Sequence, residues 1–168
     1  MRVIIDAFGG DNAPLEILRG CADAVKELGV DITAVGKADE IKKCASDNGI
    51  SLERITVHDA PDIMKMTDDP LNIRHASNQT SMAIGLRLLA AGEGDAFVSA
   101  GSTGALVVGG TFIVKRIKGI KRAAIASVMP SEKAPFMLMD SGANLDCTPD
   151  SLVQFASMGN IYMHNILG

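Results

Sequence analysis

Short runs of β-branched and apolar residues alternate along this chain with segments of helical period. This alternation constrains the fold more than any other feature. Residues 2–6 (R-V-I-I-D) are typical of a buried strand. After Pro14, apolar residues recur at helical spacing from Leu18 until Gly29 ends the helix. The further expected strands cover residues 31–35, 54–58, 95–99, 123–129 and 136–140, and the further helices cover 37–48, 80–92, 103–118 and 148–163.

Strands interleaved with helices indicate an α/β fold with a mainly parallel sheet and helices on both of its faces. The chain has 168 residues without an obvious linker or repeat, so we expect a single α/β unit over residues 1–168. Residues 59–79 are polar and irregular, and we expect a loop there that contains a short helix. Residues 96–114 carry no charge, but their glycines and hydroxyl residues favour a strand, a turn and a packed helix over a membrane span.

Three of the expected strands end in a glycine-bearing turn. The turns cover residues 9–12, 101–104 and 141–144. In a parallel sheet all three would lie at one edge, beyond the carboxyl ends of the strands, where open α/β sheets bind ligands. Glycine leaves backbone N–H groups accessible, and helix N-termini attract negative charge. The turns therefore predict a pocket for an anion, although tight packing alone also explains a glycine turn.

Composition and missing motifs exclude several functions. The sequence has no G-x-G-x-x-G, G-x-x-x-x-G-K-[ST] or G-x-S-x-G pattern, which disfavours dinucleotide binding, nucleoside triphosphate binding and serine hydrolysis. A formal charge of −4 and an aromatic content of 4% disfavour nucleic acid as a partner. The three cysteines are scattered, so we expect no metal site and a reducing compartment.

One run of positive charge stands out on this acidic chain. Five cationic residues fall within residues 115–122: Lys115, Arg116, Lys118, Lys121 and Arg122. Such a run is typical of a docking surface for an acidic protein or an anionic membrane, or of a helix end whose cations offset the helix dipole. Cys147 could be a nucleophile, but no histidine is near it in sequence, and a small packed residue explains it better.

Five stretches make the sequence recognisable. They are I-D-A-F-G-G-D-N-A-P (5–14), S-A-G-S-T-G-A-L (99–106), R-I-K-G-I-K-R-A-A (116–124), D-S-G-A-N-L-D-C (140–147) and L-V-Q-F-A-S-M-G (152–159). In this order they closely resemble the phosphate acyltransferase family of bacterial phospholipid synthesis (PlsX), collinearly over nearly the whole chain. Two positions depart from the family pattern: Asn78, where the family usually has a basic residue, and Ser102, where asparagine is more common.

The resemblance implies a function. Members of this family transfer a fatty acyl group from acyl carrier protein to inorganic phosphate, which gives acyl phosphate for phospholipid synthesis, and they need no cofactor. Their fold is similar to that of phosphotransacetylases and isopropylmalate dehydrogenases. They are homodimers in the cytoplasm that act at the inner face of the membrane. Family chains are about twice this long, so we expect the N-terminal half of an enzyme, which can be inactive alone.

On this hypothesis the turns hold the reactants. The expected phosphate- or substrate-binding residues are Gly9, Gly10, Asp11, Asn12, Gly101, Thr103, Gly104 and Gly142. Asn144 and Ser102 are the expected catalytic donors to the oxyanion, and the basic run is the expected docking site for acyl carrier protein. Phosphate is itself an anionic nucleophile, so we expect direct transfer without an acyl-enzyme.

Other functions stay open at this point. A phosphotransacetylase that uses coenzyme A would share the fold and the chemistry, but residues 140–147 favour the phosphate acyltransferase family. A non-catalytic phosphate-binding fragment is the alternative from a different class. A hydroxyacid dehydrogenase on the related fold is disfavoured, because the sequence lacks a nucleotide fingerprint.

Overall fold

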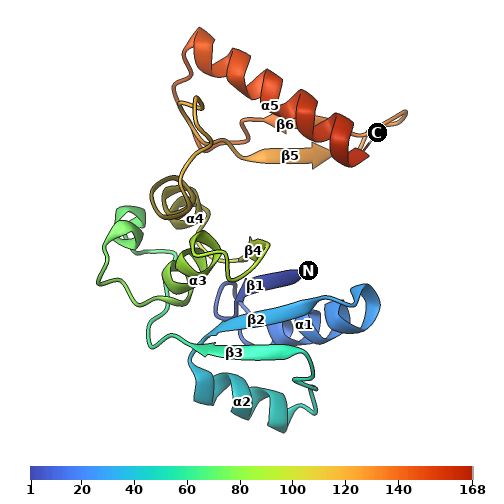
Figure 1. Cartoon of the computed structure of the whole chain (residues 1–168), viewed down its shortest axis with the longest axis vertical. Coiled ribbons are helices and arrows are strands. Elements are labelled where there is room, and N and C mark those ends of the chain that lie inside the picture. The colour runs from blue at the N-terminus through green and yellow to red at the C-terminus, as the bar shows by residue number, and fades with distance from the viewer. Residues whose placement is uncertain (168) are drawn as a thin grey trace. The chain divides into compact units, whose positions relative to one another are not determined.

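A computed structural model describes residues 1–167 of the chain (Figure 1). The sequence predicts a single α/β unit, and the tertiary contacts group the chain into two compact units, Met1–Val114 and Lys115–Gly168. Each unit is described by itself below.

The first unit is built on a four-stranded parallel sheet. Its strands are β1 (Arg2–Asp6), β2 (Asp31–Gly36), β3 (Ile55–Asp59) and β4 (Ala96–Val98), in the spatial order β3-β2-β1-β4. In the central ladder Ile5 of β1 lies between Ala34 of β2 and Val98 of β4. This is the open parallel sheet that the sequence predicts, and the carboxyl ends of β1 and β4 lie side by side at one edge.

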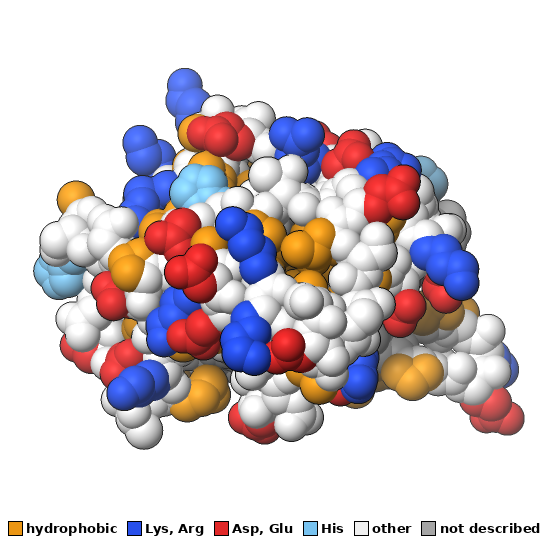
Figure 2. All heavy atoms as spheres, turned by 90° about the horizontal axis from the view of Figure 1, so that it is seen from below, with side chains coloured by type: hydrophobic (Ala, Val, Ile, Leu, Met, Phe, Trp, Pro, Cys, Tyr) orange, Lys and Arg blue, Asp and Glu red, His pale blue; other side chains and the backbone are white. Residues whose placement is uncertain are grey.

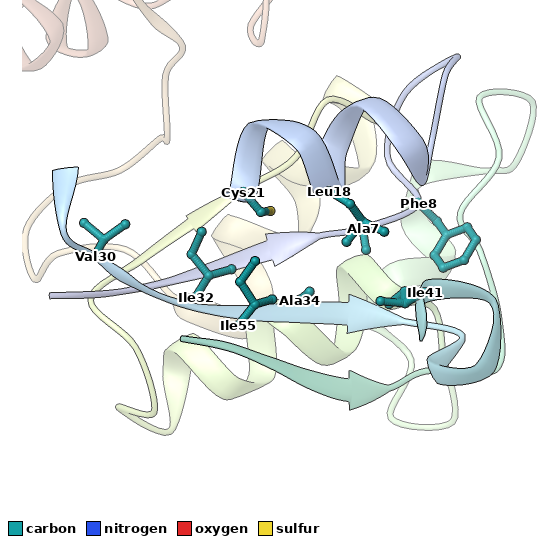
Figure 3. Packing of buried hydrophobic residues seen from close by; sticks show 9 residues of the cluster. All are labelled: Ala7, Phe8, Leu18, Cys21, Val30, Ile32, Ala34, Ile41 and Ile55. Atoms are coloured by element: carbon teal, nitrogen blue, oxygen red, sulfur yellow. The ribbon is translucent and has the colours of Figure 1, made fainter. Parts of the chain in front are cut away.

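Helices cover both faces of this sheet, as expected. The helices α1 (Leu15–Leu28) and α2 (Ala38–Asp47) pack on one face, where Leu18, Ile32 and Ile41 belong to one buried cluster (Figure 3). On the opposite face, Ile4 and Val35 are buried together against side chains of α3 (Ser81–Ala90). Successive strand residues point to opposite faces, so one strand serves both layers.

The outer surface of this unit is mixed in charge. Figure 2 shows lysine, arginine and acidic side chains interspersed over one face of the molecule, with few apolar side chains between them. The exposed ion pairs of this unit include Lys43 with Asp47 on α2 and Arg54 with Asp31 between β3 and β2. No single sign dominates this face, so it offers little attraction to a highly charged partner.

The remaining elements of the first unit are short. The irregular segment contains the 3-10 helix η1 (Pro70–Arg74), and the uncharged stretch forms β4, a turn, α4 (Thr103–Gly109) and one turn of π-helix, η2 (Gly110–Val114). We expected the helix to run to residue 118, but it ends at Val114, and Lys115 adopts a positive φ of 75°. No helix among the described residues is long and apolar enough to cross a membrane.

The second unit departs from the prediction. Its strands β5 (Ala126–Met129) and β6 (Phe136–Met139) do not join the parallel sheet but pair with each other in antiparallel fashion. Only residues 130–135 connect them, whereas a parallel crossover needs about a dozen residues or more. The helix α5 (Pro149–Leu167) packs on this hairpin, with Phe155 fully buried.

Candidate functional site

The first two glycine turns meet at the edge of the parallel sheet. A Cβ atom added to Gly9 would lie only 2.7 Å from both Asp6 Oδ2 and Ser99 Oγ, and 2.8 Å from the Gly101 nitrogen. A Cβ on Gly101 would in turn lie 3.3 Å from Gly9 Cα. These distances leave no room for a side chain, so glycine is required by the close approach of the two turns. The prediction that residues 9–12 and 101–104 share one edge is confirmed.

A buried carboxylate ties these turns together. Asp6, at the end of β1, is 2% exposed, and its carboxylate accepts hydrogen bonds from Ser81 Oγ at 2.6 Å and Ser99 Oγ at 2.8 Å. It also accepts one from the Phe8 backbone N–H at 3.2 Å. Ser99 Oγ accepts a further bond from the Gly101 N–H at 3.0 Å. Three segments, the two turns and the start of α3, are therefore held by one side chain.

The side chains expected in the second turn are partly committed to local structure. Ser102 is buried and caps α4, because its Oγ accepts a hydrogen bond from the Ala105 N–H at 3.3 Å. Thr103 follows as the first residue of α4, and Gly104 faces Pro70 of η1 at 3.1 Å from an added Cβ. The Ser102 hydroxyl accepts in this bond and is 5% exposed, and Ser102 is not among the residues that line the hollow described next.

A hollow of about 440 Å³ lies where the two turns face a third segment. Its lining residues are Phe8, Gly10, Asp11, Ile63, Met64, Lys65, Met66, Ala100 and Gly101. Gly10 has a φ of +111°, which favours glycine and turns the backbone at the rim. Asn12 lies next to these residues in the first turn and is exposed. The volume is ample for a small oxyanion, and both turns present backbone to it.

Lys65 lines this hollow and was not among the site residues that the sequence predicted. It is the only cationic residue among those lining this hollow, and no acidic partner lies within ion-pair distance of it among the described residues. Its own backbone N–H donates to Asp68 Oδ2 at 2.8 Å. Met64, which is 8% exposed, anchors the segment in the core, and the Ser81 N–H holds Asp62 O at 3.0 Å. The loop thus fixes the backbone from which a positive charge can reach the hollow.

The third turn belongs to the second unit. Because β6 lies in an antiparallel hairpin, the prediction that this turn ends a strand of the parallel sheet was wrong. Asp140 accepts hydrogen bonds from the backbone N–H groups of Ile125 at 2.7 Å and Asn144 at 2.6 Å. Partial burial tends to raise the pKa of Asp140, but these bonds outweigh it and hold the pKa below its ordinary value. Gly142 turns the backbone with a φ of +118°.

Asn144 is engaged within its own turn. Its Nδ2 donates to Ala123 O at 2.9 Å and to Asp140 Oδ2 at 3.2 Å, so both amide hydrogens are in use. Donation by Asn144 to an oxyanion requires one of these bonds to open. Cys147 Sγ lies 3.9 Å from Asn144 O, in a half-buried position. Among residues 1–167, no three metal-ligating side chains gather into a site.

The basic run folds as a loop attached to α5. Lys121 forms an ion pair with Asp150 at 2.9 Å, and Arg116 Nη1 donates to Lys121 O at 2.5 Å. Arg122 Nη1 donates to Asp146 O at 2.8 Å. Lys115 and Lys118 are exposed. Two arginines of the run thus support backbone carbonyls, and the lysine ammonium groups carry most of the accessible charge.

Three comparisons with known proteins agree with this architecture. The model of a family described as "Fatty acid synthesis protein" matches residues 1–168. A phosphate acyltransferase from Clostridium acetobutylicum is 41% identical over 169 residues, which are 100% of this chain and 51% of that protein. A phosphate acyltransferase from Clostridium tetani is 42% identical over 168 residues, 99% of this chain and 50% of that protein. This chain therefore spans about half the length of these curated relatives.

A solved structure shares the fold. A phosphotransacetylase from Streptococcus pyogenes superposes with a TM-score of 0.72 at 19% identity, covering 93% of this chain and 51% of that chain. At this level of identity the match shows the fold alone, and it agrees with the predicted similarity to phosphotransacetylases.

Proposed function

Because the chain belongs to the fatty acid synthesis protein family, we propose that it is part of a phosphate acyltransferase. The proposed reaction moves a fatty acyl group from the thioester of acyl carrier protein to inorganic phosphate. The product is acyl phosphate, which supplies phospholipid synthesis. The observation that carries the proposal is the meeting of the two glycine turns around a hollow that Lys65 also lines.

In this reaction the protein has two main tasks, which are to position phosphate against the thioester and to stabilise the negative charge that forms. A phosphate oxygen attacks the thioester carbonyl carbon, a C–O bond forms, and the C–S bond breaks. The thiolate leaves with the bonding electrons and takes up the proton that phosphate releases. Positioning is worth up to about 7–11 kcal/mol of the barrier, and one oxyanion donor about 3–4 kcal/mol.

We assign phosphate to the first two turns. The proposed phosphate-binding residues are Gly9, Gly10, Asp11, Asn12, Gly101, Thr103 and Gly104. Of these, Gly10, Asp11 and Gly101 line the hollow. Ser102 offers a hydroxyl proton to the oxyanion. Lys65 adds a positive charge that offsets the charge of phosphate. For Gly142 and Asn144, which belong to the second unit, the proposed roles are substrate binding and donation to the oxyanion, and Asn144 can donate once one of its amide hydrogens is released.

The basic run is the proposed docking surface for acyl carrier protein. Lys115 and Lys118 are exposed, and Lys121 is held near the start of α5 by Asp150. Acidic partners are attracted to such a surface over about 8–10 Å at physiological salt. Reversing the charges of Lys115 and Lys118 should raise the KM for acyl carrier protein and leave the KM for phosphate unchanged. An unchanged KM for the carrier would remove this assignment.

We further propose a cytoplasmic homodimer that acts at the inner face of the membrane as a peripheral protein, with no cofactor. Residues 1–168 correspond to the N-terminal half of an enzyme of the relatives' length, so turnover is expected in the full-length protein.

A labelled-phosphate assay tests the function. The full-length protein is incubated with palmitoyl-acyl carrier protein and radiolabelled phosphate, and labelled acyl phosphate is measured. Acetyl coenzyme A replaces the carrier thioester in a parallel arm. Product from the carrier alone is the expected result, and product from acetyl coenzyme A alone would establish the phosphotransacetylase alternative. Phosphate binding by calorimetry without turnover would establish a non-catalytic binding module.

A variant tests direct transfer. In the full-length protein Cys147→Ser should retain turnover, because no acyl-enzyme is needed. Loss of turnover with an unchanged circular dichroism spectrum would contradict direct attack by phosphate.

A further inference from the structure

A second hollow, of about 410 Å³, lies between α1 and the sheet. It shares one wall with the 440 Å³ hollow to which phosphate is assigned, which is called the phosphate hollow below. Ala100 lines both hollows, and Asp6 and Ser99 line the second one beside it. The two spaces are therefore neighbours on either side of the segment that follows β4.

The walls of the second hollow are apolar along nearly their whole length. The apolar and small lining residues are Met1, Val3, Ile5, Ile17, Gly20, Cys21, Ala24, Leu28, Val30, Ile32 and Val98. In Figure 3, Cys21 of α1 and Ile32 of β2 point toward each other in the layer between helix and sheet. Val98 is 53% exposed and Leu28 is 72% exposed, although both are apolar. Exposed apolar residues beside an apolar hollow are typical of a ligand groove or of a contact with another protein segment.

The charge of the walls matches an uncharged chain with one polar end. The two charged side chains, Asp6 and Glu16, both lie toward the turn end of the hollow. Asp6 is buried in hydrogen bonds, and Glu16 is paired with Arg19 at 2.6 Å. Burial raises the pKa of Cys21 to about 11, so its thiol is neutral at pH 7. The side chains around the far end, such as Leu28 and Val30, are uncharged.

The dimensions suit a single flexible chain. The lining residues of α1 run from Glu16 to Leu28, which at about 1.5 Å per residue makes the hollow about 18 Å long. A stable contact with a second protein copy needs about 800 Å² per partner, and the lining of this hollow exposes far less. A narrow apolar slot that ends beside a polar turn fits a hydrocarbon chain with a carbonyl group at one end.

We propose that this hollow binds the fatty acyl chain of the substrate. The acyl carbonyl lies at Ser99 and Ala100, where phosphate in the neighbouring hollow can reach it, and the hydrocarbon extends along α1 toward Leu28. The inference rests on the proposed acyl transfer, and it adds the place where the chain binds and a residue that sets its length. Gly20 is that residue, because an added Cβ there meets no atom within 4 Å and a larger side chain can extend into the slot.

The test measures how the affinity for fatty acids depends on their chain length and on the free volume of the second hollow. Octanoate, laurate and palmitate, each below its micelle concentration, are titrated into the full-length protein by calorimetry. Each methylene buried in an apolar site tightens binding by about fourfold, so affinity should rise steeply along the series. Gly20→Leu should weaken palmitate binding at least tenfold, the equivalent of about two lost methylenes, and weaken octanoate binding less, because fewer carbons of the shorter chain extend past Gly20. Gly20→Ala is the matched control, since it adds only one small methyl group and should leave the series unchanged.

Each outcome of this experiment supports or overturns the proposal. If Gly20→Leu does not fold, Ala24→Leu takes its place, because Ala24 lines the same wall. Equal affinity for the three fatty acids, or an unchanged palmitate affinity in the leucine variant, would overturn the proposal. A leucine variant that alters the oligomeric state instead would show that a protein segment occupies the slot. If the labelled-phosphate assay fails while Gly20→Leu still shortens the preferred chain, the transfer reaction is wrong and the acyl site stands.

Discussion

Replacing Asp6 tests whether one carboxylate holds the candidate site together. In Asp6→Ala, the Ser81 hydroxyl and the Phe8 N–H lose their acceptor in the buried interior, since these residues are 1% and 9% exposed. Ser99 is half-buried and keeps its bond to the Gly101 N–H, so it loses less. At about 1–3 kcal/mol for each of these two buried groups left unsatisfied, the expected loss of unfolding free energy is about 2–6 kcal/mol.

Asp6→Asn separates shape from charge. Asparagine has the same outline, its carbonyl oxygen can still accept, and a serine hydroxyl can rotate to accept from its amide group. We therefore expect a loss of only about 1 kcal/mol, the net value of a typical hydrogen bond. Asp23→Ala is the control, because Asp23 is exposed on α1 and its removal should change stability by about 0.5 kcal/mol or less.

Urea unfolding followed by circular dichroism measures these differences, and phosphate calorimetry on the same variants reports the site. The reasoning requires Asp6→Ala to lose both stability and phosphate affinity, with Asp6→Asn in between. A loss below about 0.5 kcal/mol in Asp6→Ala would refute the role of this carboxylate, because that is the range of exposed substitutions.

Three further predictions follow from the described contacts. Gly9→Ala should lower the free energy of unfolding by about 1–3 kcal/mol and abolish phosphate binding, because its Cβ would lie 2.7 Å from two oxygens. Gly20→Ala is the control in the same urea experiment, and it should stabilise α1 by about 0.5–1 kcal/mol. Lys65→Met should raise the KM for phosphate about fivefold, which corresponds to about 1 kcal/mol for an exposed charge. Lys26→Met, at another exposed lysine, should leave this KM unchanged. An increase in KM that does not shrink at high salt would contradict an electrostatic role. Asp140 has a lowered folded pKa, so its contribution is fully present above the unfolded value near 4 and is lost as pH falls through the lower folded value. Asp140→Asn should therefore flatten the acid limb of the stability profile below about pH 4, and an unchanged profile would remove Asp140 from that account.

The sequence predicted the elements whose signals are local. The β-branched run at residues 2–6 and the glycine at position 29 marked β1 and the end of α1, where Gly29 adopts a φ of 64°. The first two turns were found because a glycine follows within three residues of the end of each strand, Gly9 after β1 and Gly101 after β4. The hairpin of β5 and β6 was missed, although the six residues 130–135 between the strands are too few for a parallel crossover.

The long-range parts of the site have no local signal. Asp6 is separated from Ser81 by 75 residues and from Ser99 by 93, and no periodic pattern joins them. Lys65 lies in an irregular loop, where neither strand nor helix spacing says which way a side chain points. In the same loop Met64 is 8% exposed and Met66 is 72% exposed, and nothing in the local spacing distinguishes the two methionines.

Phosphate titration followed by amide chemical shifts in nuclear magnetic resonance tests the central claim most directly. If the two turns form an oxyanion site, the N–H signals of Gly10, Asp11 and Gly101 should move together along one saturable curve, and that curve should weaken in Lys65→Met. Signals of these turns that stay still while shifts gather at Lys115 and Lys118 would place phosphate on the basic run and contradict the account.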